Sequence, residues 1–233
     1  MSSPRLFIAL DTTDRVRAQG LARAIGNRAG IKLGLEFFAA NGPAGVERVR
    51  QPDQRLFLDL KFHDIPNTVA GAVRAAAALA PDLLTLHAAG GSAMLRAARD
   101  AAAGASTPPI LLAVTVLTSF KEAGLAETGQ RGPLGDQALR LARLARDAGL
   151  KGAVCSAHEI GSLKAELGPH FRLAVPGLRP AGASMDDQAR VMTPAEAVRA
   201  GADWLVIGRP VTAAPDPDAA LARILEEMEE AGP

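Results

Sequence analysis

Short apolar runs alternate with longer amphipathic segments along the whole chain of 233 residues. The apolar runs are often β-branched and nearly continuous in hydrophobicity, which is typical of parallel strands that are covered on both faces. They predict strands at Leu6–Leu10, Ile31–Leu35, Arg55–Leu60, Leu83–His87, Ile110–Leu117, Gly152–Ser156, Arg172–Val175 and Trp204–Ile207. Segments with helical periodicity lie between them, among them Val16–Ile25, Val69–Leu79, Gly135–Ala148, Pro194–Ala200 and Asp218–Glu230.

Eight strand–helix units within 233 residues match the usual size of a (β/α)8 TIM barrel, so we predict an α/β fold of this type. No linker, low-complexity tract or shift in composition divides the chain, and we expect residues 1–233 to form a single domain. The main structural alternative is an open, doubly wound sheet. A dinucleotide-binding sheet carries Gly-x-Gly-x-x-Gly after its first strand, whereas this chain has Leu10-Asp11-Thr12 there, and the difference favours the barrel.

Charge and cysteine content narrow the class of protein. The chain has 26 Lys and Arg residues against 25 Asp and Glu, so it lacks the basic excess of a nucleic-acid-binding protein and we expect no nucleic-acid partner. Cys155 is the only cysteine, which excludes an intramolecular disulfide and favours a reducing, cytoplasmic location. The run Leu6–Leu10 is too short for a signal peptide, and no apolar run approaches the ~20 residues of a membrane helix. We therefore expect no association with a membrane.

The candidate chemistry lies where the predicted strands end, because barrel enzymes carry their active sites at the carboxyl ends of the strands. The densest polar cluster spans residues 58–68. Asp59 and Lys61 are two residues apart, so they should share the face of the strand that lines the barrel mouth, while Leu58 and Leu60 take the other face. An isolated Asp-x-Lys pair is more often a solvated pair of charges than a catalytic one. The polar residues at all the predicted strand ends are Asp11, Lys32, Asp59, Lys61, Asp64, His87, Thr118, Ser156, Arg179, Gly208 and Arg209.

The segment from Leu58 to Thr68 closely resembles the signature of orotidine 5'-phosphate decarboxylases, which reads Asp-x-Lys-x-x-Asp followed by Ile-Pro-Asn-Thr. Four further blocks of the chain also resemble this family, and five blocks in the family's order and spacing are a far more specific signal than one short motif. The resemblance implies decarboxylation of orotidine 5'-monophosphate to uridine 5'-monophosphate, the last step of de novo pyrimidine nucleotide biosynthesis, with no cofactor and no metal. The four further blocks, which resemble the bacterial members of the family in order and spacing, are Lys32–Glu36, Thr115–Ser119, Pro176–Pro180 and Val206–Thr212.

The resemblance also implies a catalytic group. Loss of CO2 from C6 of the pyrimidine leaves an electron pair in the plane of the ring, where the π system cannot delocalise it. A nearby cation must stabilise that charge and then supply a proton, and the resemblance gives this role to Lys61. Asp59 and Asp64 are expected to favour the charged ammonium and to hold it in place. In the family, the residues that match Asp64, Ile65 and Thr68 reach into the neighbouring subunit's site, which implies an obligate homodimer with shared active sites.

Three further positions match residues that bind the nucleoside part of the substrate. Asp11 and Lys32 match the ribose-binding positions of the family, and Thr118 matches a residue that hydrogen-bonds the pyrimidine. Without the resemblance, these would be interpreted as a loop-capping aspartate, a surface lysine and a structural threonine. The strand around Lys32 is otherwise apolar, which favours a function for this lysine.

The phosphate site is expected after the last two strands, where phosphate sites recur in barrels. Gly208 permits close approach of the backbone, and Arg209 offers a planar fork of N–H donors. Residues 176–187 are rich in Gly, Pro, Ala and Ser. This composition suits a lid, and the family closes such a loop over the phosphate with residues that match Arg179 and Gln188.

Two other functional hypotheses remain open. A metal-dependent sugar-phosphate decarboxylase or aldolase of the same superfamily shares Asp-x-Lys-x-x-Asp, but it places a metal-binding glutamate where this chain has Lys32. A non-enzymatic barrel that senses nucleotides would be free to lose its acid–base residues, whereas Asp59, Lys61 and Asp64 are all present here. We therefore favour the metal-independent decarboxylase.

Overall fold

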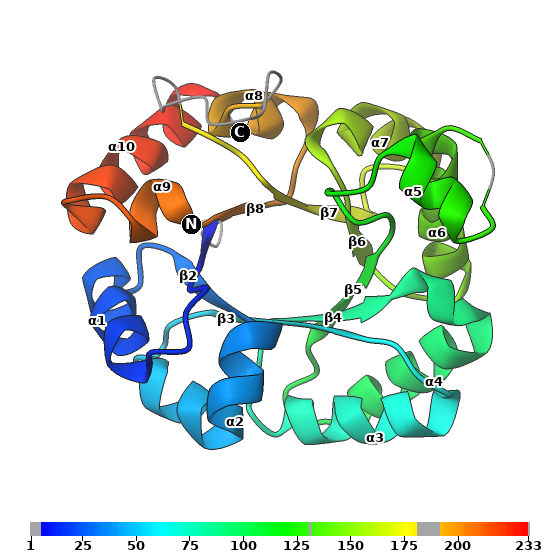
Figure 1. Ribbon diagram of the computed structural model, residues 1–233, viewed down its shortest axis with the longest axis horizontal. Coiled ribbons are helices and arrows are strands. Elements are labelled where there is room, and N and C mark those ends of the chain that lie inside the picture. Colours follow the sequence, from blue (N-terminus) through cyan, green and yellow to red (C-terminus); the bar gives the residue numbers. More distant parts are fainter. Residues whose placement is uncertain (1–5, 131, 181–191, 233) are drawn as a thin grey trace.

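The computed structural model describes residues 6–130, 132–180 and 192–232. In this part of the chain eight parallel strands close into a barrel in sequence order, and β8 pairs with β1. Figure 1 shows the strands around the centre and the helices as an outer ring. The predicted (β/α)8 barrel is therefore confirmed. The strands are β1 (Leu6–Ala9), β2 (Gly30–Gly34), β3 (Leu56–Phe62), β4 (Leu83–His87), β5 (Ile110–Val114), β6 (Gly152–Val154), β7 (Arg172–Pro176) and β8 (Trp204–Ile207).

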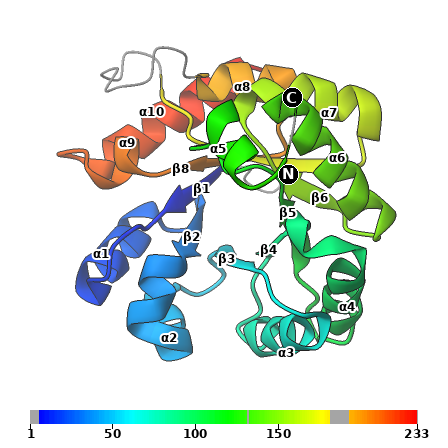
Figure 2. The ribbon, with the colours of Figure 1, turned by 45° about the vertical axis from the view of Figure 1, so that its right-hand side comes forward.

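Helices follow each strand and cover the outside of the barrel. In Figures 1 and 2, α3 and α4 lie side by side beneath the strands. Within the described residues, no helix is both long and apolar enough to cross a membrane. The α-helices are α1 (Arg15–Ile25), α2 (Leu35–Val49), α3 (Pro66–Ala77), α4 (Gly91–Ala103), α5 (Glu122–Glu127), α6 (Leu134–Asp147), α7 (Ile160–Leu167), α8 (Pro194–Ala200), α9 (Arg209–Thr212) and α10 (Pro217–Glu230), with short 3₁₀ turns at Ala88–Gly90 and Ala157–Glu159.

Several helices begin where a side chain satisfies their free backbone N–H groups. Thr193 accepts a hydrogen bond from the backbone of Glu196, and the Glu196 carboxylate accepts one from the backbone of Thr193, which is a capping box at the start of α8. Asp14 and Asp216 cap α1 and α10 without a reciprocal bond, because one carboxylate oxygen of each accepts hydrogen bonds from the backbone of the first turn. These local signals explain why the predicted start of α8 at Pro194 is confirmed.

Three predicted strands are longer than the observed β1, β5 and β6, and the difference is largest at β5. The apolar run at 110–117 predicts a strand to Leu117, but β5 ends at Val114. Val116 and Leu117 instead lie in the following loop and line a cavity at the mouth of the barrel. Their apolar character therefore comes from a cavity wall rather than from a strand, and hydrophobicity alone does not separate the two.

The core has two layers. The inner cluster fills the barrel itself, and a larger cluster packs between the strands and the helices. A Cβ atom at Gly30 would lie 2.4 Å from the ring of Phe7, so the glycine leaves the space that this ring occupies. The inner cluster consists of Phe7, Ala9, Phe57, Leu83, Leu112, Ala174, Trp204 and Val206.

Strand β3 carries an irregularity that determines the direction of its functional side chains. Its register against β4 shifts between Leu58 and Phe62, and Lys61 has a φ of 47°, in the left-handed region. A bulge of this kind re-aims side chains at the end of a strand. Asp59 and Lys61 do point the same way, as predicted, but regular alternation is not the whole reason for it.

Candidate active site

A cavity of about 320 Å³ lies at the carboxyl ends of the strands. Ala9, Phe57 and Val206 belong both to its lining and to the inner cluster, so the packed barrel interior forms its floor. Charged and polar side chains make up much of the remaining wall. The predicted site residues that line this cavity are Asp11, Lys32, Asp59, Lys61, Thr118, Arg179, Gly208 and Arg209.

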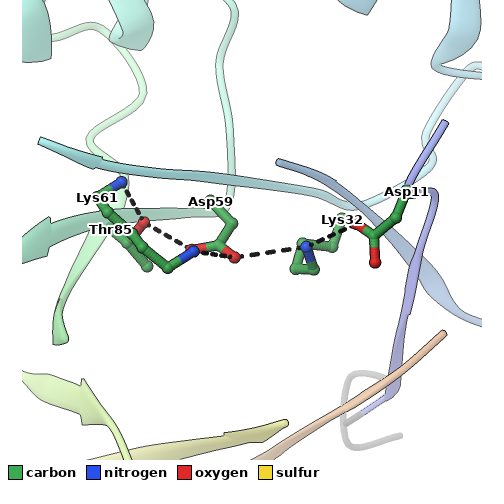
Figure 3. Close-up of polar contacts among 5 residues, drawn as sticks. All are labelled: Asp11, Lys32, Asp59, Lys61 and Thr85. Atoms are coloured by element: carbon green, nitrogen blue, oxygen red, sulfur yellow. Dashed lines mark hydrogen bonds and ion pairs between the residues drawn. The ribbon is translucent and has the colours of Figure 1, made fainter. Parts of the chain in front are cut away.

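Four of these residues form a row of alternating charge across strands β1 to β3 (Figure 3). The Nζ atom of Lys61 lies 2.8 Å from Oδ2 of Asp59, and the Nζ atom of Lys32 lies 3.4 Å from the same oxygen. Lys32 Nζ is also 3.4 Å from Oδ1 of Asp11. Gly34 makes room for this row, because a Cβ atom there would lie 3.3 Å from the Lys32 Nζ atom. The row fixes two ammonium groups at the mouth of the barrel.

Asp59 is the centre of the row. Its side chain is only 14% exposed. Burial raises the pKa of Asp59, but the charges of Lys32 and Lys61 and hydrogen bonds from Lys61 and Thr85 outweigh burial, so the pKa is lowered overall. Asp59 is therefore ionised at neutral pH and neutralises part of the charge of the two lysines.

The opposite wall carries cations from the last two strand ends. Arg179 follows β7, and Gly208 and Arg209 follow β8. A Cβ atom at Gly208 would lie 3.5 Å from the Ala9 Cβ atom and 3.8 Å from Asp11 Oδ2, so this glycine faces the same mouth as the charged row. Among the described residues, two carboxylates and four cations line the cavity, and this part of the wall has an excess of two positive charges for an anionic ligand.

Three predicted site residues are not brought to this cavity within one chain. Asp64, Ile65 and Thr68 are exposed around the start of α3, and none of them lines the cavity. One carboxylate oxygen of Asp64 accepts a hydrogen bond from the backbone N–H of Ile65 at 2.6 Å. Gln188 lies outside the described residues, and the predicted lid segment 176–187 is described only as far as residue 180.

Two histidines lie next to the cavity. The rings of His63 and His87 are stacked with their centroids 5.3 Å apart, and His87 Nδ1 accepts a hydrogen bond from the backbone of Ala89. Burial, together with the charges of His63 and Lys61, lowers the pKa of His87. The two rings pack against each other, and neither histidine is among the residues that line the cavity. Within the described residues, no three His, Cys, Asp or Glu side chains are grouped so that they could hold a metal ion.

The sequence did not indicate every residue of the site. Phe57, Val114, Val116, Leu117 and Val154 also line the cavity, and nothing in their apolar runs separates them from core residues. Thr85 is the clearest omission, because its hydroxyl group bonds to both Asp59 and the backbone of Lys61. The available signal is a single polar residue, two positions before His87, in an otherwise apolar strand.

Comparisons of this chain with known proteins, by sequence and by structure, point to one family. The sequence model described as "Orotidine 5'-phosphate decarboxylase / HUMPS family" matches residues 4–224. The orotidine 5'-phosphate decarboxylase of Paramagnetospirillum magneticum is 50% identical over 96% of this chain and 97% of that protein, and the one of Rhodospirillum rubrum is 53% identical over 98% and 95%. A crystal structure of orotidine 5'-phosphate decarboxylase from Lactobacillus acidophilus is 36% identical, with a TM-score of 0.85 over 97% of this chain and 99% of the other.

Proposed function

The chain belongs to the orotidine 5'-phosphate decarboxylase / HUMPS family, and we propose that its reaction, the decarboxylation of orotidine 5'-monophosphate to uridine 5'-monophosphate, depends on Lys61 as the group that stabilises and protonates the ring carbon. This reaction belongs to pyrimidine nucleotide biosynthesis. The observation that carries the mechanism is the 2.8 Å ion pair between Lys61 Nζ and Asp59 at the wall of the cavity.

In the proposed reaction, the bond between C6 and the carboxylate carbon breaks, and CO2 departs without the electron pair. The pair remains on C6, in the ring plane, where the Lys61 ammonium stabilises it electrostatically. A proton then moves from Lys61 Nζ to C6, and the resulting amine recovers a proton from solvent. Asp59 keeps Lys61 charged before the reaction, because a carboxylate at this distance favours the ammonium form.

The charges of the cavity suit the substrate. We assign the phosphate to the wall that carries Gly208, Arg209 and Arg179, with Gln188 as a further contact, because charge-assisted donors bind a phosphate strongly. The ribose is assigned to Asp11 and Lys32, which line the cavity between the phosphate wall and Lys61.

The pyrimidine is assigned to the part of the cavity between Thr118 and Lys61. Phe57, Val114 and Val116 supply apolar surface in the same cavity. An apolar surface with a few polar groups is the usual composition of a small-molecule site.

We further propose that two chains form a homodimer with shared active sites. Asp64, Ile65 and Thr68 do not line the cavity of their own chain, and the side chain of Ile65 is 67% exposed. An exposed isoleucine beside an aspartate suits a contact with a second copy, in which Asp64 would reach the partner's Lys61. Lys61 would then be held between two carboxylates, one from each chain.

The cellular location and the domain organisation of the protein are also part of this proposal. We propose a cytoplasmic location and a single domain over residues 1–233. Closure of the barrel by pairing of β1 with β8 supports the single domain, because it ties the two ends of the strand sequence together. The one cysteine, Cys155, is buried, which suits a reducing compartment.

An ultraviolet absorbance assay on orotidine 5'-monophosphate tests the function directly. The wild type should bleach the substrate absorbance. Lys61→Ala should lower kcat by several powers of ten, roughly 5 kcal/mol or more of barrier, and still bind uridine 5'-monophosphate. A Lys61→Ala variant that turns over at a rate near wild type would exclude the proposed role of Lys61.

A further inference from the structure

Thr85 is a buried polar residue that the mechanism above does not use. It lies in β4 between Leu84 and Leu86, its exposed fraction is 0%, and it does not line the cavity. A buried hydroxyl group destabilises a fold unless it is hydrogen-bonded. The partners of Thr85 therefore indicate why this residue type is present in an otherwise apolar strand.

The two partners of the Thr85 hydroxyl group are Asp59 and Lys61, the pair to which the proposed mechanism assigns the catalytic charge (Figure 3). The backbone N–H of Lys61 donates to Thr85 Oγ1 at 2.9 Å, and Thr85 Oγ1 lies 2.9 Å from Oδ1 of Asp59. A backbone N–H can only donate, so the oxygen of Thr85 is the acceptor there. Its single proton is therefore free to be donated to the ionised carboxylate. One hydroxyl group thus bonds to both members of the pair, in fixed directions.

The contact with Lys61 coincides with the bulge in β3. Lys61 has a φ of 47°, a conformation that non-glycine residues adopt rarely and keep when their surroundings hold them. The register between β3 and β4 shifts at the same point. The hydrogen bond from the Lys61 backbone to Thr85 therefore holds the bulged residue against β4.

The contact with Asp59 orients the carboxylate. Because Oδ1 accepts from Thr85, Oδ2 is turned toward the lysines, and it is the atom that both Lys32 and Lys61 approach. Rotation of the carboxylate would break these contacts together. The three contacts come from three neighbouring strands, β2, β3 and β4, and leave the carboxylate one orientation.

We propose that Thr85 is a positioning residue, whose hydroxyl group fixes the backbone of Lys61 and the carboxylate of Asp59 together and so places the Lys61 ammonium at the reacting carbon. The proposal rests on the proposed role of Lys61. It adds that the placement depends on a residue of the neighbouring strand that does not line the cavity. Small errors in the placement of a catalytic group are costly, with ~1 Å worth up to roughly 100-fold in rate.

Three variants test this. Thr85→Val removes the hydroxyl group at nearly constant volume, and Thr85→Ser keeps it. Thr115→Val is the matched control, because Thr115 is also buried but its hydroxyl group donates to the backbone oxygen of Val154. The measurements are kcat, the Kd of uridine 5'-monophosphate, the pH dependence of kcat/KM, and the titration of the Asp59 carboxyl carbon by NMR without substrate.

Thr85→Val should lower kcat about 30- to 100-fold and leave the Kd for uridine 5'-monophosphate within about twofold. Loss of the hydrogen bond raises the pKa of Asp59, so the acid limb of the pH profile and the carboxyl titration should both move to higher pH. Thr85→Ser should recover most of kcat and the wild-type titration. Thr115→Val should leave kcat and the Asp59 titration as in the wild type.

The proposal is overturned if Thr85→Val keeps kcat within about threefold of Thr115→Val, or if Thr85→Ser fails to restore it. If Thr85→Val does not fold, Thr85→Ala carries the same expectations and the same contrary outcomes. A wild type without decarboxylase activity would refute the proposed function instead. Even in an inactive protein, the NMR titration of the Asp59 carboxyl carbon tests whether Thr85 acts on Asp59. A titration of Asp59 that is unchanged in Thr85→Val would overturn the proposed action of Thr85 on this carboxylate.

Discussion

Lys32 and Lys61 lie on neighbouring strands and direct their Nζ atoms at a single oxygen atom, Oδ2 of Asp59, at 3.4 and 2.8 Å. Two ammonium groups so close together repel each other, and their repulsion is strong in a partly buried site. The carboxylate between them is therefore what allows both cations to remain at the mouth of the barrel. This relationship makes Asp59 the residue on which the charge pattern of the site depends.

Asp59→Asn should consequently affect both activity and stability. The substitution keeps the size of the side chain and removes its charge, so we expect kcat to fall at least about 100-fold and the free energy of unfolding at pH 7 to fall by about 2–3 kcal/mol. The lowered pKa of Asp59 means that the ionised form stabilises the fold above the ordinary aspartate value of about 3.9. This stabilisation is lost as the pH falls below that value and through the folded-state pKa.

Urea denaturation of the wild type and of Asp59→Asn over a range of pH measures this effect. The difference between their free energies of unfolding should be constant from about pH 5 to 8 and should narrow as the pH falls toward 3. A difference that widens in acid would contradict the lowered pKa of Asp59.

The phosphate assignment predicts a selective loss of affinity in Arg209→Ala. Charge-assisted hydrogen bonds contribute roughly 1.5–3 kcal/mol, so the affinity for uridine 5'-monophosphate should fall about 10- to 100-fold. The affinity for uridine, which lacks the phosphate, should not change. Isothermal titration with both ligands measures the difference, and Arg209→Lys, which keeps the charge without the planar fork, should lie between wild type and Arg209→Ala. An equal loss for both ligands would place Arg209 outside the phosphate site.

Shared active sites predict that two inactive variants restore activity when they are mixed. In a mixed dimer of Lys61→Ala and Asp64→Ala, one of the two sites combines an intact Lys61 with an intact Asp64. Random exchange of subunits at equal concentrations makes half of the dimers mixed, so about a quarter of wild-type activity should return. Activity that stays at the sum of the separate variants would argue that Asp64 does not act across chains.

The alternative of a metal-dependent sugar-phosphate decarboxylase or aldolase predicts a different response to a chelator. With Lys32 in the charged row of the cavity, the mechanism assigned to this chain has no step that uses a metal ion. Decarboxylation of orotidine 5'-monophosphate should therefore continue at an unchanged rate after dialysis against EDTA. Activity that disappears with EDTA and returns with magnesium would favour the alternative.

The close packing of the barrel predicts opposite effects for two Gly→Ala substitutions. At Gly152 in β6, a Cβ atom would lie 2.4 Å from the backbone oxygen of Arg172, which cannot move without disturbing β7, so we expect a loss of at least about 1–3 kcal/mol. At Gly20, inside α1, the added Cβ would meet no atom within 4 Å beyond its chain neighbours and the backbone of its own helix, and alanine should stabilise the helix by about 0.5–1 kcal/mol. Thermal or urea unfolding measures both, and a stable Gly152→Ala would contradict the packing between β6 and β7.

The parts of the fold that could be predicted from the sequence are those with local causes. The strand Trp204–Ile207 and the helix Pro194–Ala200 were predicted at their observed bounds, because an apolar run and a capping box act within a few residues. Val116 and Leu117 were wrongly placed in a strand, because a cavity wall and a buried strand are equally apolar. Local patterns thus predict which elements form, and less well where they end.

The candidate site was predictable to the extent that its residues lie at strand ends. Asp59 and Lys61 share one strand, so their proximity could be predicted from their spacing. Thr85 stands out as a polar residue in an apolar strand, but its contacts could not be predicted, because they depend on how β3 and β4 are aligned. The bulge at Lys61 that sets this alignment has no signal in the sequence. Asp64 and Ile65 were assigned from the family resemblance alone, and in the proposed homodimer their role depends on a second chain.

The inner cluster has a consequence for the order of events in catalysis. In the part of the chain that the structure describes, Phe7, Leu83, Leu112 and Trp204 fill the barrel beneath the cavity, so the cavity is a dead end. With the substrate assigned to this cavity, CO2 leaves the pyrimidine ring inside it. Because the packed interior closes the barrel below, we expect the substrate to enter, and both products to leave, at the carboxyl ends of the strands.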